Sequence, residues 1–175
     1  FDPPLVNYPI GYSLFLAPLA GLFFSYPEFG QAASLILSVI GIFLIWKLSA
    51  ALLPSPWGYF FALWYGLHPI VIRYASTVLS DPLFLVFSLS IFWLCGRRPA
   101  KANWSHDLGL GLLLGCFTLI RTIGLALVLA VALDRILASQ GKQLARVLAV
   151  FLGICAPWFI WVYSTSGHAP SYLIS

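Results

Sequence analysis

Charged residues are scarce in this sequence. Only 8% of the 175 residues are Asp, Glu, Lys or Arg, whereas 61% are hydrophobic and 17% are aromatic. A soluble domain carries about 25% charged residues, so a chain with a third of that share cannot coat a water-facing surface. The composition therefore predicts an integral membrane protein. The net charge of +4 does not indicate nucleic-acid binding, because the basic residues fall in short loops where membrane orientation accounts for them.

Patterns typical of common metal and catalytic centres are also missing. The sequence contains no HExxH, no CxxC and no glycine-rich phosphate loop, and its histidines show no metal-ligand spacing. The three cysteines, Cys95, Cys116 and Cys155, lie in or beside apolar runs. Their odd number and apolar setting favour free packing thiols over a disulfide framework.

Long apolar runs dominate the sequence instead. A helix that crosses a bilayer needs about 20 apolar residues, or somewhat fewer when the local membrane is thinner. The runs show no barrel-like alternation of polar and apolar residues, so we expect helices. The predicted fold is all-α, a polytopic transmembrane bundle whose spanning helices lie at residues 31–53, 57–74, 83–95, 108–120, 123–137 and 144–163. The fourth and fifth runs alternatively form one long helix broken near Arg121.

Basic residues assign a side to each loop. Most of the nine Lys and Arg residues fall on one side of this arrangement, which the positive-inside rule makes cytoplasmic. The outward side receives the arginines Arg73 and Arg121, together with the acidic residues Asp2, Asp81 and Glu28, the last an expected loop residue. The cytoplasmic set comprises Lys47, Arg97, Arg98, Lys101, Arg135, Lys142 and Arg146.

The chain is predicted to be a single transmembrane domain with three parts. Residues 1–30 form an outer loop and a helix in the outer interface, residues 31–163 the helix bundle, and residues 164–175 the start of another outer loop. The apolar run 8–24 carries prolines and tyrosines, and tyrosine favours the headgroup level. A spanning helix with a proline kink is the alternative. Because the sequence opens without methionine or a signal peptide, we expect a fragment of a longer protein.

The most polar stretch outside the basic loops is residues 73–84. Asp81 precedes Pro82 and an apolar run, which is the pattern of a helix N-cap with proline at the first helical position, and Ser80 could share the capping. A capping carboxylate at a membrane face keeps an oxygen for a ligand, so Asp81 is also a candidate catalytic residue. Arg73 is a candidate substrate-binding residue or a snorkelling anchor in the outer headgroups.

Arg121 stands between apolar residues and has to reach a partner or water. A planar guanidinium suits the phosphate of a lipid substrate, which makes Arg121 a candidate substrate-binding residue. His68 is a weaker candidate, since it more simply bonds a neighbouring carbonyl. We expect His106 to be a cytoplasmic loop residue, and Asp134 and Arg135 to form a local ion pair at the membrane boundary.

Four short motifs resemble one family in their order and spacing. They are YPIGYSLFLA at 8–17, FG at 29–30, LSDPLF at 79–84 and LIRTIG at 119–124. The chain resembles the GT-C superfamily of polytopic glycosyltransferases, in the branch that contains protein O-mannosyltransferases and lipid A aminoarabinose transferases. There the corresponding patterns read roughly YPPGYPLLLA, lFG, lSEplF and lxRPtGl. The resemblance covers most of the chain.

The resemblance implies roles for two of the candidate residues. Asp81 takes the place of the acidic residue in the lSEplF pattern, with aspartate for the commoner glutamate. Arg121 takes the place of the arginine in the RPtG pattern, with Thr122 where proline is usual. The implied roles are orientation of the acceptor for Asp81 and phosphate binding for Arg121.

The resemblance also draws attention to the first residues of the chain. Tyr8 begins the YPPG-like run, which includes Tyr12, and both tyrosines are candidate substrate-binding residues. The first acidic motif of the family normally lies upstream of this run, so the chain is expected to lack it. Asp2 lies in the same outer loop and is a candidate substrate contact, but it is not matched to that motif.

The implied activity is transfer of a sugar from a polyprenyl-phosphate donor to a lipid, glycan or protein acceptor at the outward face. Some relatives need a divalent metal ion and others do not, so the resemblance leaves the cofactor open. The lean loops suggest a prokaryotic inner membrane. The alternative is a membrane transporter or a non-enzymatic envelope subunit. Transporters place charges near the bilayer midplane, whereas here they gather at one face, which favours the enzyme.

Overall fold

A computed structural model describes residues 10–22, 27–97 and 103–166, and all regular structure in them is helical. The all-α prediction is therefore confirmed. The chain divides into two compact units, an N-terminal unit, Tyr12–Arg98, and a C-terminal unit formed by Phe1–Gly11 and Pro99–Ser175. The elements are α1 (Gly11–Leu22), α2 (Pro27–Leu52), α3 (Trp57–Gly66), α4 (Pro69–Ala75), α5 (Asp81–Gly96), α6 (Trp104–Ile120), the 3-10 turn η1 (Thr122–Gly124), α7 (Leu125–Leu137) and α8 (Gly141–Ser166).

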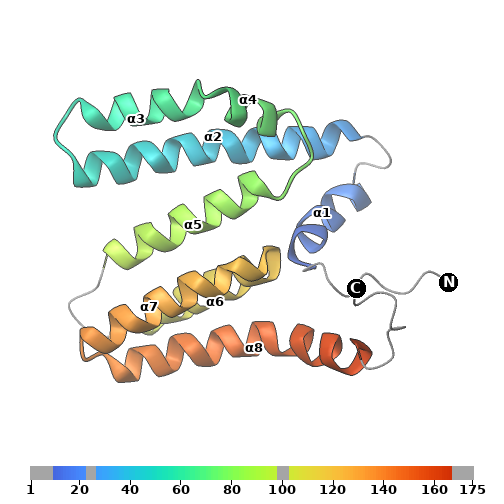
Figure 1. Cartoon of the computed structure of the whole chain (residues 1–175), viewed down its shortest axis with the longest axis vertical. Coiled ribbons are helices and arrows are strands. Elements are labelled where there is room, and N and C mark those ends of the chain that lie inside the picture. Colours follow the sequence, from blue (N-terminus) through green and yellow to red (C-terminus); the bar gives the residue numbers. More distant parts are fainter. Residues whose placement is uncertain (1–9, 23–26, 98–102, 167–175) are drawn as a thin grey trace. The chain divides into compact units, whose positions relative to one another are not determined.

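Helix α2 is the centre of the N-terminal unit, because α3, α4 and α5 all pack against it. Helices α3 and α4 run back along α2, and α5 then runs in the same direction as α2 (Figure 1). Two glycines of α2 lie where α5 and the connection before it pack closely against α2. A Cβ on Gly30 would lie 2.7 Å from Val78, and one on Gly41 would lie 3.2 Å from Leu85. The start of α2, the end of α4 and the start of α5 therefore share one end of the unit.

The predicted spanning segment 57–74 is not one helix. It breaks between α3 and α4, where His68 adopts an extended conformation with φ −67° and ψ 126°. Pro69 is the physical reason, because proline has no N–H and disfavours helical backbone in the residue before it. The Nδ1 atom of His68 accepts a hydrogen bond from the N–H of Ile70 at 3.3 Å, so this histidine caps the new helix.

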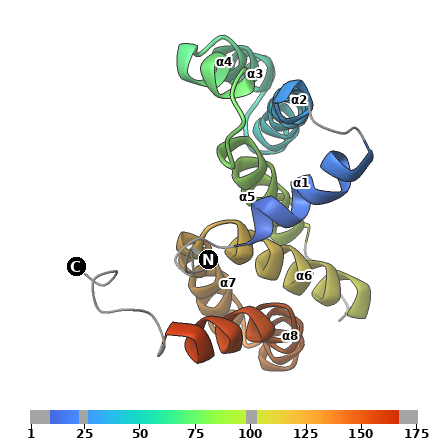
Figure 2. The ribbon, with the colours of Figure 1, turned by 90° about the vertical axis from the view of Figure 1, so that its right-hand side faces the viewer.

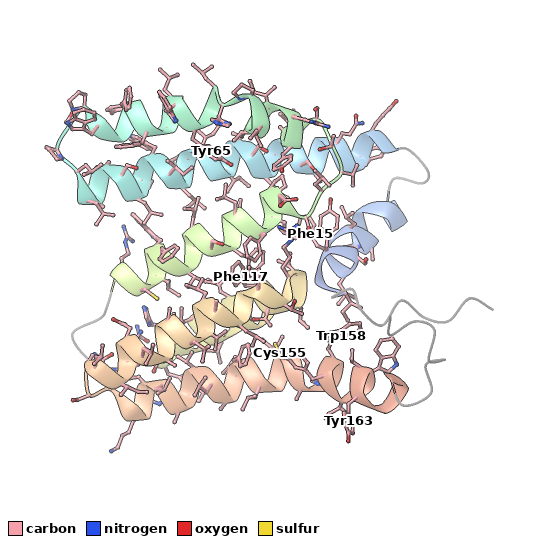
Figure 3. The ribbon with its side chains drawn as sticks, viewed as in Figure 1. Phe15, Tyr65, Phe117, Cys155, Trp158 and Tyr163 are labelled. Atoms are coloured by element: carbon pink, nitrogen blue, oxygen red, sulfur yellow. The ribbon has the colours of Figure 1, made fainter. Side chains whose placement is uncertain are left out.

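The C-terminal unit is built on two parallel helices, α6 and α8. Helix α7 runs antiparallel to both and connects the end of α6 to the start of α8 (Figure 2). Close approach again depends on glycine. A Cβ on Gly111 would lie 2.7 Å from the carbonyl oxygen of Val147, and one on Gly115 would lie 2.9 Å from Ile154. Figure 3 shows Cys155 on the side of α8 that faces α6, and its Sγ lies 3.5 Å from the carbonyl oxygen of Gly115. Small residues four apart let two helix backbones meet in a membrane protein.

In the part of the chain that the structure describes, two helices are long and apolar enough to cross a bilayer. They are Glu28–Leu52 within α2 and Gly141–Ser164 within α8, and only 17% and 22% of their most apolar stretches are buried inside the chain. A core helix of a soluble protein would be mostly buried, so the exposed apolar surface indicates a lipid environment. Helices α5 and α6 have 16 and 17 residues, which is short for a crossing. The arrangement of six spanning helices stays a prediction.

The sequence left open whether residues 108–137 form one helix or two. The structure has two, because α6 ends at Ile120 and Arg121 adopts an extended conformation before η1 and α7. The apolar run near the start of the chain gives α1, which has 12 residues and contains Pro18. At 1.5 Å per residue it is about 18 Å long and falls short of a bilayer core of about 30 Å. Its predicted place in the outer interface stays a prediction.

The glycine contacts between α6 and α8 lead to a stability prediction. Replacing Gly111 with Ala should lower the free energy of unfolding by about 1–3 kcal/mol, because the methyl group meets the backbone of α8. The matched control is Gly153→Ala, since a Cβ there meets nothing within 4 Å. Alanine favours a helix over glycine, so this control should not lower stability. Thermal unfolding in detergent micelles measures both, and equal melting temperatures would contradict the packing.

Candidate functional site

Three charged side chains of the N-terminal unit lie at one of its ends. This polar end consists of Glu28 in the first turn of α2, Arg73 in the last turn of α4, Ser76 after it, and Asp81 at the start of α5. Val78 fixes the connection by packing on Gly30 of α2. Sequence reasoning had Glu28 as a loop residue, but it is helical. An acidic residue in a first helical turn, where the helix dipole favours negative charge, is the signal that could have shown this.

The connection after α4 is held by its own hydroxyl groups. The side chains of Ser76 and Thr77 both donate to the carbonyl oxygen of Arg73, at 2.9 Å and 3.1 Å. These bonds satisfy carbonyl groups that a helix end leaves without partners. The Arg73 side chain itself is exposed, so the polar end presents a cation to its surroundings.

Asp81 is not the N-cap that the sequence suggested. Helix α5 begins at Asp81, Ser80 occupies the cap position, and the Ser80 side chain makes no capping hydrogen bond. Pro82 follows in the first turn and is buried, as is Leu83 at 1% exposure. The two apolar residues thus anchor the turn, while the half-buried carboxylate lies where the positive end of the helix dipole favours a negative charge.

A groove of about 530 Å³ runs along α2 from the polar end. Glu28, Gln31 and Ser76 line it near the polar end, and apolar or small side chains line the rest. These are Ala32, Leu35, Val39, Ile42, Gly66, Val71, Ile72 and Ala75, together with Ser38. From Glu28 to Ile42 the helix rises about 20 Å, so the groove has room for an extended hydrocarbon chain.

The candidate residues near the start of the chain are only partly visible. Tyr8 and Asp2 lie outside the described residues. Tyr12 lies in the first turn of α1, beside Ser34 of α2. Partial burial raises the pKa of the Tyr12 phenol, and the neighbouring Ser34 side chain opposes that rise in part. Tyr12 is therefore neutral at ordinary pH and available as a hydrogen-bond donor.

Arg121 lies in the C-terminal unit at the turn between α6 and α7. Its N–H donates to the carbonyl of Phe117 at 3.2 Å, its carbonyl accepts from the N–H of Gly124 at 2.9 Å, and the residue is exposed. Gly124 is needed for this turn, because a Cβ there would lie 2.9 Å from the Phe117 ring. The buried residues Ile120 and Gly124 fix the backbone on both sides of Arg121.

Aromatic residues of α8 lie at the same end of the C-terminal unit. The α6 and α8 contacts are in register, with Gly115 beside Ile154, so Trp158 and Trp161 follow at the level of Arg121 and beyond. Their rings stack with centroids 5.0 Å apart, and Figure 3 shows Trp158 and Tyr163 on this last part of α8. Sequence reasoning missed the tryptophan pair, although the spacing of three residues on a helix predicts contact.

The opposite end of the C-terminal unit is basic. Buried Asp107 bonds Arg146 at 3.2 Å, and the Arg146 guanidinium lies 5.6 Å from the Trp104 ring. His106 belongs to the first turn of α6 rather than to a loop, and its Nδ1 lies 3.7 Å from Asp107. The ion pair predicted between Asp134 and Arg135 is wrong, because the Arg135 guanidinium bonds the side chains of Gln140 and Gln143 instead.

Each unit therefore has one basic end and one opposite end with the candidate residues. In the N-terminal unit Lys47 and Arg97 lie far from Arg73 and Asp81 along the parallel helices α2 and α5. Both cations rest on aromatic rings, Lys47 at 4.9 Å from Trp46 and Arg97 at 4.0 Å from Trp93. The membrane side of each end stays a prediction. Among the described residues, no three His, Cys, Asp or Glu side chains could together hold a metal ion.

A chain whose described structure is helical, with exposed apolar helices and charged side chains near the helix ends, is an integral membrane protein. Its residues 7–161 match the model of the dolichyl-phosphate-mannose-protein mannosyltransferase family, and the chain belongs to that family. It is thus a membrane glycosyltransferase of the mannosyltransferase type, and the family implies a lipid-linked sugar donor and a glycan or protein acceptor. No curated protein and no solved structure matches the chain.

Proposed function

We propose that this protein transfers a sugar from a polyprenyl-phosphate donor to an acceptor at the extracytoplasmic face of a prokaryotic inner membrane. The observation that carries the proposal is the family match over residues 7–161, which includes both the LSDPLF and the LIRTIG motifs. Asp81 and Arg121 of these motifs lie at helix ends away from the basic residues of their own units.

We infer that Asp81 and Arg121 face the same side of the membrane, and the short connection between α5 and α6 supports this. Seven residues join α5 to α6, and at about 3.5 Å per residue they do not reach across a bilayer core of about 30 Å. The end of α5 and the start of α6 therefore share the basic, cytoplasmic side. If both helices cross, Asp81 at the start of α5 and Arg121 after the end of α6 share the outward side.

The proposed reaction breaks the bond between the anomeric carbon of the sugar and the phosphate oxygen of the donor. A hydroxyl of the acceptor attacks that carbon, forms the new glycosidic bond and loses its proton to a base. Arg121 binds the phosphate and stabilises the charge that the leaving group acquires. Asp81 accepts a hydrogen bond from the acceptor hydroxyl and orients it, and Tyr12 is available as a donor to sugar hydroxyls.

The groove along α2 supports a substrate with a hydrocarbon chain. It runs from the polar end, and from Ala32 to Ile42, a rise of about 15 Å along α2, its walls are mainly apolar. We assign it to the prenyl chain of the donor, with the exposed Arg73 as a second cation near the phosphate. The transporter alternative finds less support, since Arg73, Asp81 and Arg121 all lie at helix ends rather than within spans.

The role of Asp81 can be tested by a matched pair of variants. Asp81→Asn should lower the rate of sugar transfer by about 100-fold or more, because the neutral amide no longer accepts and orients the hydroxyl in the same way. Asp81→Glu should retain activity, since it restores the carboxylate. The measurement is transfer of a radiolabelled sugar from a polyprenyl-phosphate donor in membranes, corrected for inserted protein. Wild-type transfer by the Asn variant would exclude the role.

The role of Arg121 can be tested by one variant that removes its charge and one that keeps the charge but changes its geometry. Arg121→Gln should reduce transfer by about 100-fold, because the leaving phosphate loses its cation, and Arg121→Lys should recover part of the rate. Arg97→Gln, which removes one exposed cation from the opposite end of the N-terminal unit, is the control and should transfer normally. Equal losses in Arg121→Gln and Arg97→Gln would refute a specific phosphate contact.

The side assignment has its own test. Ser76→Cys places a thiol on the exposed connection at the polar end, and Ser139→Cys places one in the exposed turn between α7 and α8. A membrane-impermeant thiol reagent applied to spheroplasts should label only Ser76→Cys, and permeabilised membranes should label both. The parent chain, with its three native cysteines, sets the background. Labelling of Ser139→Cys in intact spheroplasts would reverse the assignment.

A further inference from the structure

Arg135 is the largest fully buried side chain of the described residues, with 1% exposure. It lies in the last turn of α7, just before the short connection to α8 at the basic end (Figure 1). Its Nη1 donates to the side-chain oxygens of Gln140 and Gln143, the latter at 2.7 Å. Both partners are neutral, so neither of them compensates the positive charge of the buried guanidinium.

The remaining nitrogens of Arg135 have no acceptor. Nε and Nη2 are buried, and no described residue offers them a hydrogen bond. The buried carboxylate Asp107, at the start of α6, bonds Arg146 instead. A buried arginine with unused N–H groups is unfavourable unless something supplies acceptors, and one that supplies negative charge compensates it best.

The charges around Arg135 leave room for one anion. Among the described residues of this unit, the cations of the basic end are Arg135, Lys142 and Arg146, and the carboxylates in the same helices are Asp107 and Asp134. Three cations against two carboxylates leave one net positive charge when His106 is neutral. A headgroup whose phosphodiester has no cation of its own, as in phosphatidylglycerol, carries one net negative charge and would balance it.

The start of α8 adds a second feature that favours an anion. The first N–H groups of a helix have no partner within the helix, and the helix dipole places positive charge there. Gln140 and Gln143, which bond Arg135, flank this start. A Cβ on Gly141 would meet nothing within 4 Å, so no neighbouring side chain crowds this position at the helix start.

We propose that Arg135 and the first turn of α8 form a binding site for a phosphoryl anion at the basic face of the membrane. Two phosphate oxygens accept from Nε and Nη2 side by side, as a guanidinium fork prefers. The side chains of Gln140 and Gln143, which now accept hydrogen bonds from Arg135, turn their N–H groups toward the phosphate and donate to it. A carboxamide can do either, because it has both an oxygen and an NH₂ group. Lys142 and the N–H groups of the helix start complete the site.

Two sources can supply this chemistry, the headgroup of an anionic phospholipid and free phosphate. The experiment is thermal unfolding of the whole protein in a neutral detergent, titrated with phosphatidylglycerol, with phosphatidylcholine, or with inorganic phosphate. At about a hundred times the dissociation constant, an occupied site should raise the melting temperature by roughly 5–10 °C. A rise with phosphatidylglycerol alone identifies a lipid site, and a rise with inorganic phosphate as well identifies a general phosphoryl site.

Three variants separate the site from diffuse surface charge. Arg135→Gln removes the buried cation and should abolish the rise. Lys47→Gln removes one exposed cation outside the site and should keep it. Gln143→Glu offers an internal carboxylate to the guanidinium, so it should stabilise the protein without ligand and abolish the rise, which tests the site even if Arg135→Gln fails to fold.

Two results would overturn the proposal. One is a wild-type melting temperature that responds equally to phosphatidylglycerol and phosphatidylcholine and not to inorganic phosphate. The other is a rise that survives unchanged in Gln143→Glu or is lost equally in Lys47→Gln. Neither result bears on sugar transfer, so the proposed function stands or falls separately.

Discussion

Hydrocarbon offers no hydrogen-bond partners, and this constraint explains where the polar groups of the chain lie. Backbone groups in the bilayer have to be satisfied within a helix, so breaks and charges belong near helix ends. Arg73, Asp81 and Arg121 each stand at such a place, and serine or threonine hydroxyls satisfy the carbonyls after α4. The same constraint makes the exception informative. Arg135 is buried with unused donors, which is why it points to a ligand.

Close packing of the helices within each unit depends on glycines. Gly111 and Gly115 allow α8 to meet α6, and Gly30 allows Val78 to settle on α2. Water does not drive helices together inside a membrane, so close backbone contact has to supply much of the association. Gly124 has a related part in the Arg121 turn, because its missing side chain lets η1 press on α6. The family motif that contains Arg121 thus includes both a charged group and the glycine that positions it.

The local structure around Asp81 and Arg121 was largely predictable. Proline near the start of α5 and the polar residues before it located the helix start within one residue, although Ser80 rather than Asp81 holds the cap position. Tertiary partners were less predictable. Asp134 was the obvious neighbour for Arg135 in the sequence, yet glutamines from the next helix hold the guanidinium. A side chain can bond a residue next to it in the sequence or one that the fold brings close, and a short sequence pattern does not show which of the two it bonds.

Composition alone decided that this protein is a helical membrane protein, because so few charges cannot face water and isolated apolar runs can satisfy their backbones only as helices. The motifs by themselves indicated a GT-C glycosyltransferase, which the family match confirms. Only the tertiary structure decided that α6 and α8 pair through glycines, that a groove opens along α2, and that Arg135 is enclosed. Those features arise from the relative placement of residues that are distant in sequence, and periodicity along one helix does not determine which helix it meets.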